Sequence, residues 1–392
     1  MHSCDLVIVG SGPVAGTVAA LLAQHPWQIT RVGVSPPASG SRAIALNHSS
    51  RQLFDSLGWW EPIARQAGQI RQIEVSRQHE PGKTHLQGTD IDAAELGWVI
   101  PEEQLLTIIN EKLGGLPNLQ SISATPAALT PGETSITLGL DRGSPVTSRL
   151  IIGADGAASN LRHLAALPVS RHDFQSIAIC AAITSSQPHD YRAWERFTDS
   201  GPIALLPLPG ADHYSLVWCV DAQDAEPLLS CDESEFIRQL QQAFGHRAGR
   251  FTGAVERSAY PLSQQVCRIP VADRLALVGS AARHIHPVGG QGLNLALRDL
   301  SVLVGLINQA GRQQGDPGSS ALLQRYCDLR RGDWRATEQF ARHLPGLFAR
   351  RQLPLSLGRN LALTALEIIP PLRRAFVRRA AGQLGFHPFD HH

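Results

Sequence analysis

The sequence lacks the cysteine spacing of a disulfide or zinc framework. Its six cysteines include no Cys-x-x-Cys pair and follow no regular interval, so we expect free thiols of a reducing compartment. Long apolar runs are also missing, and none approaches the ~18 residues that a membrane-spanning helix needs. The first residues show no basic segment ahead of an apolar one, which argues against a secretory signal peptide. A cytoplasmic protein is expected.

Charge is scarce as well. Only 18% of the 392 residues are charged, and 35 basic residues nearly balance 34 acidic ones. This balance excludes a uniformly basic nucleic-acid-binding surface, so no nucleic-acid partner is expected. Because 43% of the residues are hydrophobic, the chain can bury a sizeable core in two or three domains.

The N-terminal segment carries a dinucleotide-binding fingerprint. Residues 5–9 form a short apolar run, and Gly10, Gly12 and Ala15 follow it with the spacing G-x-G-x-x-G/A before a small-residue helical stretch. In this position the glycines allow a tight turn and a close approach to a pyrophosphate, which the helix N-terminus attracts. The acid expected after the second strand is missing, because Val34 and Ser35 stand there.

Further along the chain, another buried strand over residues 149–153 is followed by Asp155 and Gly156. A carboxylate at such a strand end can accept hydrogen bonds from the ribityl or ribose hydroxyls of a dinucleotide. The alternative interpretation is a residue that only caps the turn. The sequence leaves both open.

The third such strand, over residues 274–279, leads into a glycine-rich loop and a helix over 291–307. Loop amides and a helix N-terminus suit a ring system that becomes anionic, as reduced flavin does. His284 and His286 are spaced like metal ligands, yet no carboxylate or cysteine set accompanies them. We interpret them as shaping the loop and predict no metal site.

These segments resemble the aromatic-ring flavin monooxygenases, in particular the ubiquinone-biosynthesis hydroxylases. The resemblance runs over nearly the whole chain and rests on residues 41–46, 96–100, 153–156 and 286–299. Residues 193–202, 215–219 and 257–262 are closest to the 2-polyprenyl-6-methoxyphenol hydroxylase branch. The resemblance implies an FAD site; with the fingerprint, the candidate cofactor-binding residues are Gly10, Gly12, Ala15, Arg42, Asp155, Gly156, Ser280, Pro287, Gly289, Gly290, Gln291, Gly292, Leu293 and Asn294.

The resemblance also implies the architecture. We expect an α/β fold in which a Rossmann-type FAD-binding domain joins an antiparallel β substrate domain and C-terminal helices. The FAD-binding domain would comprise residues 1–70, 98–168 and 268–330. The substrate domain would comprise residues 71–97 and 169–267, where the chain is strand-rich, and the C-terminal helical region would comprise 331–392.

The implied activity is hydroxylation of a polyprenylated phenol, with NADPH as transient co-substrate and O2 reacting through a flavin C4a-hydroperoxide. The flavin carries this chemistry, so no catalytic acid or base is predicted. Ser280 stands where the family has Asp or Asn, which together with the missing ribose acid predicts modest FAD affinity. Two alternatives remain: a non-catalytic subunit of a quinone-biosynthesis complex, and a flavin-dependent prenyl reductase.

The C-terminal stretch is rich in arginine. Residues 325–379 hold twelve arginines and four acidic residues, an excess of eight positive charges. They form either a solvated face of helices that pack on the flavin domain, or a surface that meets anionic lipid at the inner membrane face or a quinone-biosynthesis partner. In the second interpretation, apolar contacts would come from Leu361, Leu363, Leu366, Ile368 and Ile369.

Overall fold

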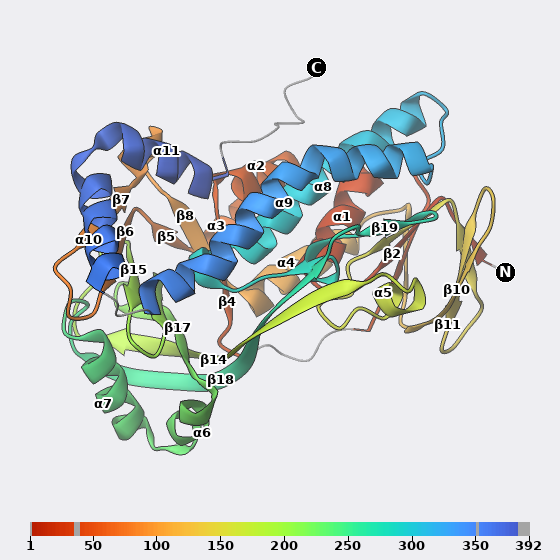
Figure 1. Cartoon of the computed structure of the whole chain (residues 1–392). Helices are drawn as coiled ribbons and strands as arrows, with labels where there is room; N and C mark the ends of the chain where they lie inside the picture. The colour runs from red at the N-terminus through yellow and green to blue at the C-terminus, as the bar shows by residue number, and fades with distance from the viewer. Residues whose placement is uncertain (1, 35–39, 350–352, 383–392) are drawn as a thin grey trace.

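The chain folds around a six-stranded, mostly parallel sheet, seen at the right of Figure 1. The structure, a computed structural model, describes residues 2–34, 40–349 and 353–382. The strand order is β19-β20-β13-β2-β3-β9, and only β19 runs antiparallel to its neighbour. In that order the strands are Val271–Ala272, Leu275–Leu277, Leu150–Gly153, Leu6–Val9, Ile29–Val32 and Leu119–Ile122.

The central strands of this sheet are buried on both faces, as a parallel sheet requires. Every residue of β2, β13 and β20 is buried. Helix α1 (Pro13–Ala23) packs on the sheet and contacts α4 (Glu102–Leu113) and α8 (Gln291–Arg312). Two small sheets lie beside it: β4-β8-β5 (Ala43–Leu46, Gly97–Pro101, Gly68–Ile70) and β1-β12-β11-β10 (His2–Ser3, Val146–Ser148, Ile136–Leu140, Pro126–Pro131).

An eight-stranded sheet, at the lower left of Figure 1, forms the second layer of the molecule. Its neighbouring strands are antiparallel except for β15 and β6, which pair in parallel. In spatial order the strands are β21 (Arg283–His284), β18 (Phe251–Cys267), β14 (Val169–Ser185), β17 (His213–Asp221), β16 (Pro202–Pro207), β15 (Arg192–Phe197), β6 (Gln72–Arg77) and β7 (Lys83–Gln87). Helices α6 (Ala222–Ser230) and α7 (Glu233–Phe244) cover the face away from α9.

Three helices complete the chain. The long helix α9 (Ser320–Ala349) runs along α8 and reaches the second sheet, where Phe348 stacks on Phe197 with 3.7 Å between ring centroids. Helix α10 (Leu353–Ile368) packs on β7, and α11 (Pro370–Ala380) packs on the short helix η1 (Gly88–Ile91). The remaining short helices are α2 (His48–Ser56), α3 (Trp60–Gln66), α5 (Asn160–Leu164), η2 (Gly279–Ala281) and η3 (Val288–Gly290).

This architecture confirms the predicted fold class. The division into domains stays our proposal, and several of its boundaries fall where the chain leaves one sheet for another. The boundary at residue 330 falls inside α9, which is continuous from Ser320 to Ala349. Residues 383–392 of the predicted helical region lie outside the described residues. No helix within the described ranges is long and apolar enough to cross a membrane.

Candidate FAD and substrate site

The turn after β2 brings three backbone segments together. Gly10 adopts φ +133°, and a Cβ there would come within 2.3 Å of the Ala154 carbonyl oxygen, so only glycine fits. Around Gly12, by contrast, an added Cβ would meet nothing within 4 Å. Gly12 also caps α1 without any side-chain hydrogen bond, so the first amides of α1 remain available to an anionic group.

Two further positions of the fingerprint region differ in what they contribute: Ala15 packs in the core, and Val34 lacks the expected acid. Ala15 is fully buried and lies 3.2 Å from the position of a Cβ on Gly10, so it serves the packing of α1 on the strand ends. The acid missing from the sequence has no substitute at Val34, whose apolar side chain is 49% exposed. Ser35 lies outside the described residues.

Asp155 caps the turn, as one of the two interpretations predicts, and its contact with the cofactor stays a prediction. Its Oδ2 accepts a hydrogen bond from the Leu161 amide at 3.1 Å. Its Oδ1 is buried and has no partner among the residues that the structure describes. Gly156 follows at φ +83°, and an added Cβ would meet no atom within 4 Å. The turn therefore holds one buried, unpaired carboxylate oxygen, followed by a glycine that has open space at its Cβ position.

Buried Arg162 connects this turn to the one after β20. Its guanidinium donates to the Ala157 carbonyl at 2.7 Å and to the Ala281 carbonyl at 2.9 Å. Burial lowers the pKa of Arg162, and the charge of Asp155 acts in the opposite direction. Sequence reasoning missed this residue because a single arginine in a short helix gives no sign of the two loops it joins.

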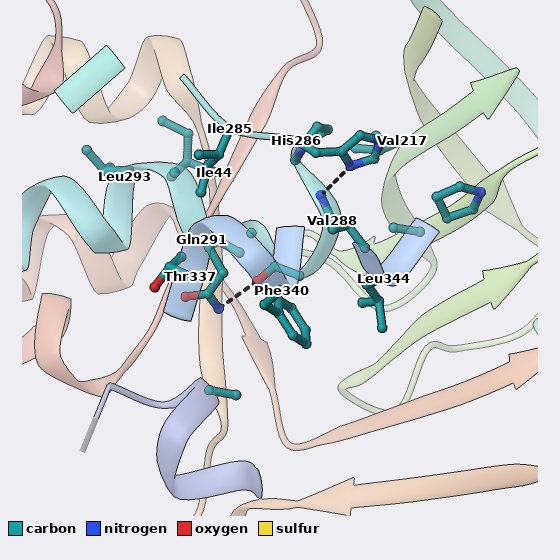
Figure 2. A pocket seen from close by; sticks show the side chains of 18 of the residues that line it. Ile44, Val217, Ile285, His286, Val288, Gln291, Leu293, Thr337, Phe340 and Leu344 are labelled. Carbon is teal, nitrogen blue, oxygen red and sulfur yellow. Dashed lines mark hydrogen bonds between the residues drawn. The ribbon is translucent and has the colours of Figure 1, made fainter. Parts of the chain in front are cut away.

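The glycine-rich loop borders the pocket shown in Figure 2 and is stabilised by hydrogen bonds between its own residues. Val288 donates its amide to His286 Nδ1 at 3.1 Å, and Gln291 Nε2 donates to the Gly289 carbonyl at 3.1 Å. Burial lowers the pKa of His286 to about 4, so the ring is neutral near pH 7. Gly289 and Gly290 have φ of +68° and +62°.

Asn294 lies behind this loop. Its Nδ2 donates to the carbonyls of Gly290 and Ala45 at 2.6 and 2.9 Å, while its Oδ1 accepts from the Asn47 amide and from the Ser50 hydroxyl. Every polar atom of this side chain thus has a protein partner. A direct contact between Asn294 and the cofactor stays a prediction that this geometry does not favour.

Arg42 stands at the opposite wall beside an acid that the sequence analysis did not select. Its Nε lies 3.5 Å from Glu102 Oε2, and its guanidinium lies 5.7 Å from the ring centre of Tyr260. Glu102 Oε2 is buried and has no hydrogen bond within the described part of the chain. The only sequence signal for Glu102 is its position directly after residues 96–100.

These segments enclose a cavity of about 1290 Å³ between the two large sheets and the C-terminal helices. Of the predicted site residues, Gly10, Ala15, Asp155 and Asn294 are not part of the lining. Those that line it are Gly12, Arg42, Gly156, Ser280, Pro287, Gly289, Gly290, Gln291, Gly292 and Leu293. The structure therefore brings most of the predicted set to one cavity.

The residues present fit FAD. The cavity has two helix N-termini without side-chain caps, those of α1 and α8, which suit phosphates and an electron-rich ring. Gly12, Gly156 and Gly292 leave open space where a side chain would stand. Asp155 Oδ1 and Glu102 Oε2, the latter 3.5 Å from Arg42 Nε, are buried without a hydrogen bond in the described part of the chain and could accept from ribityl or ribose hydroxyls. Within the described residues, no group of three or more His, Cys, Asp or Glu side chains could hold a metal ion.

Fold and site together define an FAD-dependent monooxygenase. The sequence model of the FAD binding domain family matches residues 3–341. The chain is 32% identical over 391 residues to the ubiquinone hydroxylase UbiL of Rhodospirillum rubrum, covering 98% of this chain and 91% of that protein. It is 29% identical over 394 residues to the 3-demethoxyubiquinol 3-hydroxylase of Escherichia coli, covering 96% and 98%. The chain belongs to the ubiquinone hydroxylase family of FAD-dependent monooxygenases.

The solved structures support the same fold. The p-nitrophenol 4-monooxygenase PnpA of Pseudomonas putida DLL-E4 aligns with a TM-score of 0.82 at 16% identity, over 99% of this chain and 100% of that one. The protein is thus an enzyme with FAD as cofactor, as the sequence predicts. The alternatives of a non-catalytic subunit and of a prenyl reductase are not favoured.

Proposed function

We propose that this enzyme hydroxylates a polyprenylated phenol of the 2-polyprenyl-6-methoxyphenol type in ubiquinone biosynthesis, with NADPH as reductant and O2 as oxygen source. The family relationship supports an aromatic hydroxylase. The observation that carries the finer assignment is the shape and lining of the cavity, which continues from the glycine-rich loop to the C-terminal helices.

The far part of the cavity is apolar. Its walls include Ile73, Val75 and Leu86 from the second sheet, and Leu363 and Phe376 from α10 and α11. A prenyl chain placed there would leave water, at a gain of about 0.8 kcal/mol for each buried CH2. The phenol ring at the other end would then lie near Pro287 and Gln291. Bound FAD supplies the electrons and the oxygen activation for hydroxylation.

The protein's own residues orient the reactants and exclude water. Gly289 to Gly292 line the cavity at the start of α8, and free amides at a helix N-terminus would stabilise negative charge that develops there. The neutral imidazole of His286 adds no positive charge of its own there. Phe340 and Leu344 of α9 close the same region with apolar side chains (Figure 2). An enclosed apolar site suppresses wasteful release of peroxide.

The membrane interpretation of the C-terminal region needs revision before it can be proposed. Arg330 and Arg359 are buried and ion-paired, with Asp299 and Glu80 respectively, so they do not face a bilayer. Leu363 is buried and Leu366 is half-buried in the cavity wall, so neither can add an exposed apolar contact. The predicted excess of eight charges therefore overstates the surface charge.

A smaller exposed apolar surface remains on α10 and α11, and we propose that it meets the membrane. Leu361 and Ile368 are each 70% exposed, and Ile369 and Leu372 are about half exposed. Exposed Ala362 and Ala380 also line the cavity, which therefore reaches the surface at α10 and α11. A substrate whose chain resides in a bilayer could enter there, which supports a peripheral position at the inner membrane face.

The activity can be tested with the FAD-loaded enzyme, NADPH, 18O2 and 2-geranyl-6-methoxyphenol. We expect a product that carries one 18O atom, detected by mass spectrometry. 2-Methoxyphenol, which lacks the chain, should have a kcat/KM at least ~100-fold lower, because the apolar walls then contribute little. A product with two extra hydrogens and no oxygen would instead indicate a prenyl reductase. Profiling of quinone intermediates in a deletion strain would identify the accumulating phenol.

A further inference from the structure

A single carboxylate stands on the cavity face of the second sheet. Residues from β6, β7, β14, β15, β16 and β17 line the cavity, and Glu195 of β15 is the one carboxylate among them in this fully described part of the sheet. At the other edge of the sheet, β18 and β21 add Tyr260, Arg283 and His284 to the lining. Its neighbours on that face are small or apolar. In the strand register Glu195 lies opposite Ala204, which lies opposite Val217, which in turn pairs with Cys180.

Glu195 has no polar partner among the residues that the structure describes. No residue of the described chain donates a hydrogen bond to it or forms an ion pair with it. The adjacent Arg196 cannot serve, because strand alternation directs it to the other face, where its guanidinium donates to Ser76 Oγ at 3.3 Å. Burial raises the pKa of Glu195 to about 7.

The groups around Glu195 do not offset the cost of placing its carboxyl group in this wall. The Cys180 and Cys219 thiols share the cavity face, and burial raises the pKa of both, that of Cys180 to about 11, so they carry no charge near pH 7. Glu195 is half-buried in a mostly apolar part of the cavity wall, where a carboxyl group without a donor costs stability that a glutamine or leucine would not cost. Such unpaired groups in a cavity are typical of sites that bind or react with a ligand.

We propose that Glu195 binds the hydroxyl group of the phenol and so fixes which ring carbon faces the glycine-rich loop. This rests on the proposed function. A phenol offers one O–H donor on an otherwise apolar ring, and Glu195 offers one acceptor on an otherwise apolar wall. The hydrogen bond to a carboxylate also moves electron density from the phenol oxygen into the ring, which favours attack by an electrophilic oxygen.

The hydrogen bond itself can be measured with two ligands and two variants. The ligands are 2-geranyl-6-methoxyphenol and its O-methyl ether, which has the same apolar parts but cannot donate. Both would be titrated into the FAD-loaded enzyme, with the flavin absorbance as readout. Because a hydrogen bond to a charged group is worth about 1.5–3 kcal/mol, wild type should prefer the phenol by about 10-fold or more above pH 7.

In E195L that preference should fall to near 1, while the affinity for the ether stays within about 3-fold of wild type. E195Q should retain part of the preference, since an amide oxygen still accepts, and it should change the ratio of ring-hydroxylation products. E111Q, at an exposed position on α4, is the matched control and should behave as wild type. Flavin content and circular dichroism would verify the fold of each variant.

The outcomes separate this inference from the proposed function. If wild type hydroxylates the probe while E195L and E195Q keep the full phenol preference, Glu195 does not bind the hydroxyl. Equal weakening of both ligands in E195L and E195Q would mean a structural role, and would also overturn the inference. If wild type neither binds nor hydroxylates the probe, the proposed substrate class fails, and the role of Glu195 fails with it.

Discussion

At the residue scale, the two carboxylate oxygens of Asp155 have different surroundings. Oδ2 accepts from the Leu161 amide, and Oδ1 is buried and unpaired in the described part of the chain. This separation allows the role in the fold and the role toward FAD to be tested independently. An asparagine can keep an oxygen toward Leu161 while it removes the charge.

We predict that Asp155→Asn folds with nearly wild-type thermal stability in the FAD-free form but binds FAD at least ~10-fold more weakly, because a charge-assisted hydrogen bond is lost. Flavin fluorescence titration and the melting temperature of the apo form measure the two effects. Asp141→Asn is the control, since Asp141 also accepts from a backbone amide, that of Thr125, but is exposed. Unchanged FAD affinity of Asp155→Asn would refute the cofactor role.

For Ser280 we predict the opposite effect, namely that a substitution strengthens FAD binding. It is exposed to the cavity just after β20, with a side chain shorter than the Asp or Asn of the family. Ser280→Asn should raise FAD affinity by about 2- to 13-fold, the effect of one net hydrogen bond of ~0.5–1.5 kcal/mol. Retention of flavin after dialysis and the Kd measure this gain. Ser280→Ala should show no gain; if both variants bind FAD equally well, Ser280 does not limit affinity.

At the element scale, a buried ionic network joins α8 to α9. Asp299 Oδ1 accepts from Arg330 Nε at 2.6 Å and from Trp334 Nε1 at 2.8 Å. Asp333 accepts from Arg298 and Arg330. Burial alone would raise the pKa of Asp333, but these two arginines lower it to about 2. The network fixes α9, whose other residues close the cavity.

We predict that Asp299→Asn lowers the free energy of unfolding by about 3–5 kcal/mol, because it leaves the Arg330 charge buried with less compensation. Urea unfolding of the apo protein measures the loss. The double variant Asp299→Leu/Arg330→Met, which removes both charges, should recover much of the stability. If the single variant is as stable as wild type, the network contributes nothing to the α8–α9 packing.

The elements also show what the sequence could predict. Short buried strands with glycine turns, such as Leu6–Val9 and Leu150–Gly153, were placed well because burial and turn chemistry are both local. The sequence indicates only that residues 169–267 are strand-rich, and the 17-residue length of β14 and β18 could not be predicted because polar residues interrupt their apolar pattern. Helix α6 could not be predicted, because Pro227 lies inside it and interrupts its helical pattern.

The candidate site could be predicted only in part, because some of its residues gain their surroundings from segments that are distant in the chain. Motif residues such as Gly12 and Gly289 contribute through backbone geometry that the local sequence encodes. Glu102, Arg162 and Glu195 acquire their surroundings from strands and loops that are distant in the chain. No periodicity in the sequence reports that a carboxylate will lack a donor in the fold.

At the scale of the whole molecule, the cavity and the α10–α11 surface form one continuous feature. The cavity runs from the glycine-rich loop to exposed residues of these helices, next to Leu361 and Ile368. Arg373 is held by Asp90 at 2.8 Å, so its replacement would disturb the docking of α11 on η1. Arg374 and Arg379 are exposed and form no ion pair within residues 2–34, 40–349 and 353–382. They are the better targets for a test of charge.

We predict that the enzyme floats with anionic vesicles and that added salt weakens but does not abolish this binding. Each basic residue near the surface contributes about 1 kcal/mol, attenuated by salt, whereas the apolar contribution resists salt. Arg374→Glu/Arg379→Glu should therefore remove the salt-dependent part. Leu361→Ser/Ile368→Ser should remove the salt-resistant part.

The control is Val255→Ser/Ile269→Ser, which changes two exposed apolar residues outside α10 and α11 and should float as wild type.

The variant Leu361→Ser/Ile368→Ser should also separate membrane binding from catalysis. With a short-chain phenol in solution, Leu361→Ser/Ile368→Ser should turn over normally, because the glycine-rich loop is untouched. With a long-chain phenol embedded in vesicles its rate should fall in proportion to flotation. Equal flotation of all variants would mean that α10 and α11 are merely solvated, and that the phenol reaches the cavity by another route.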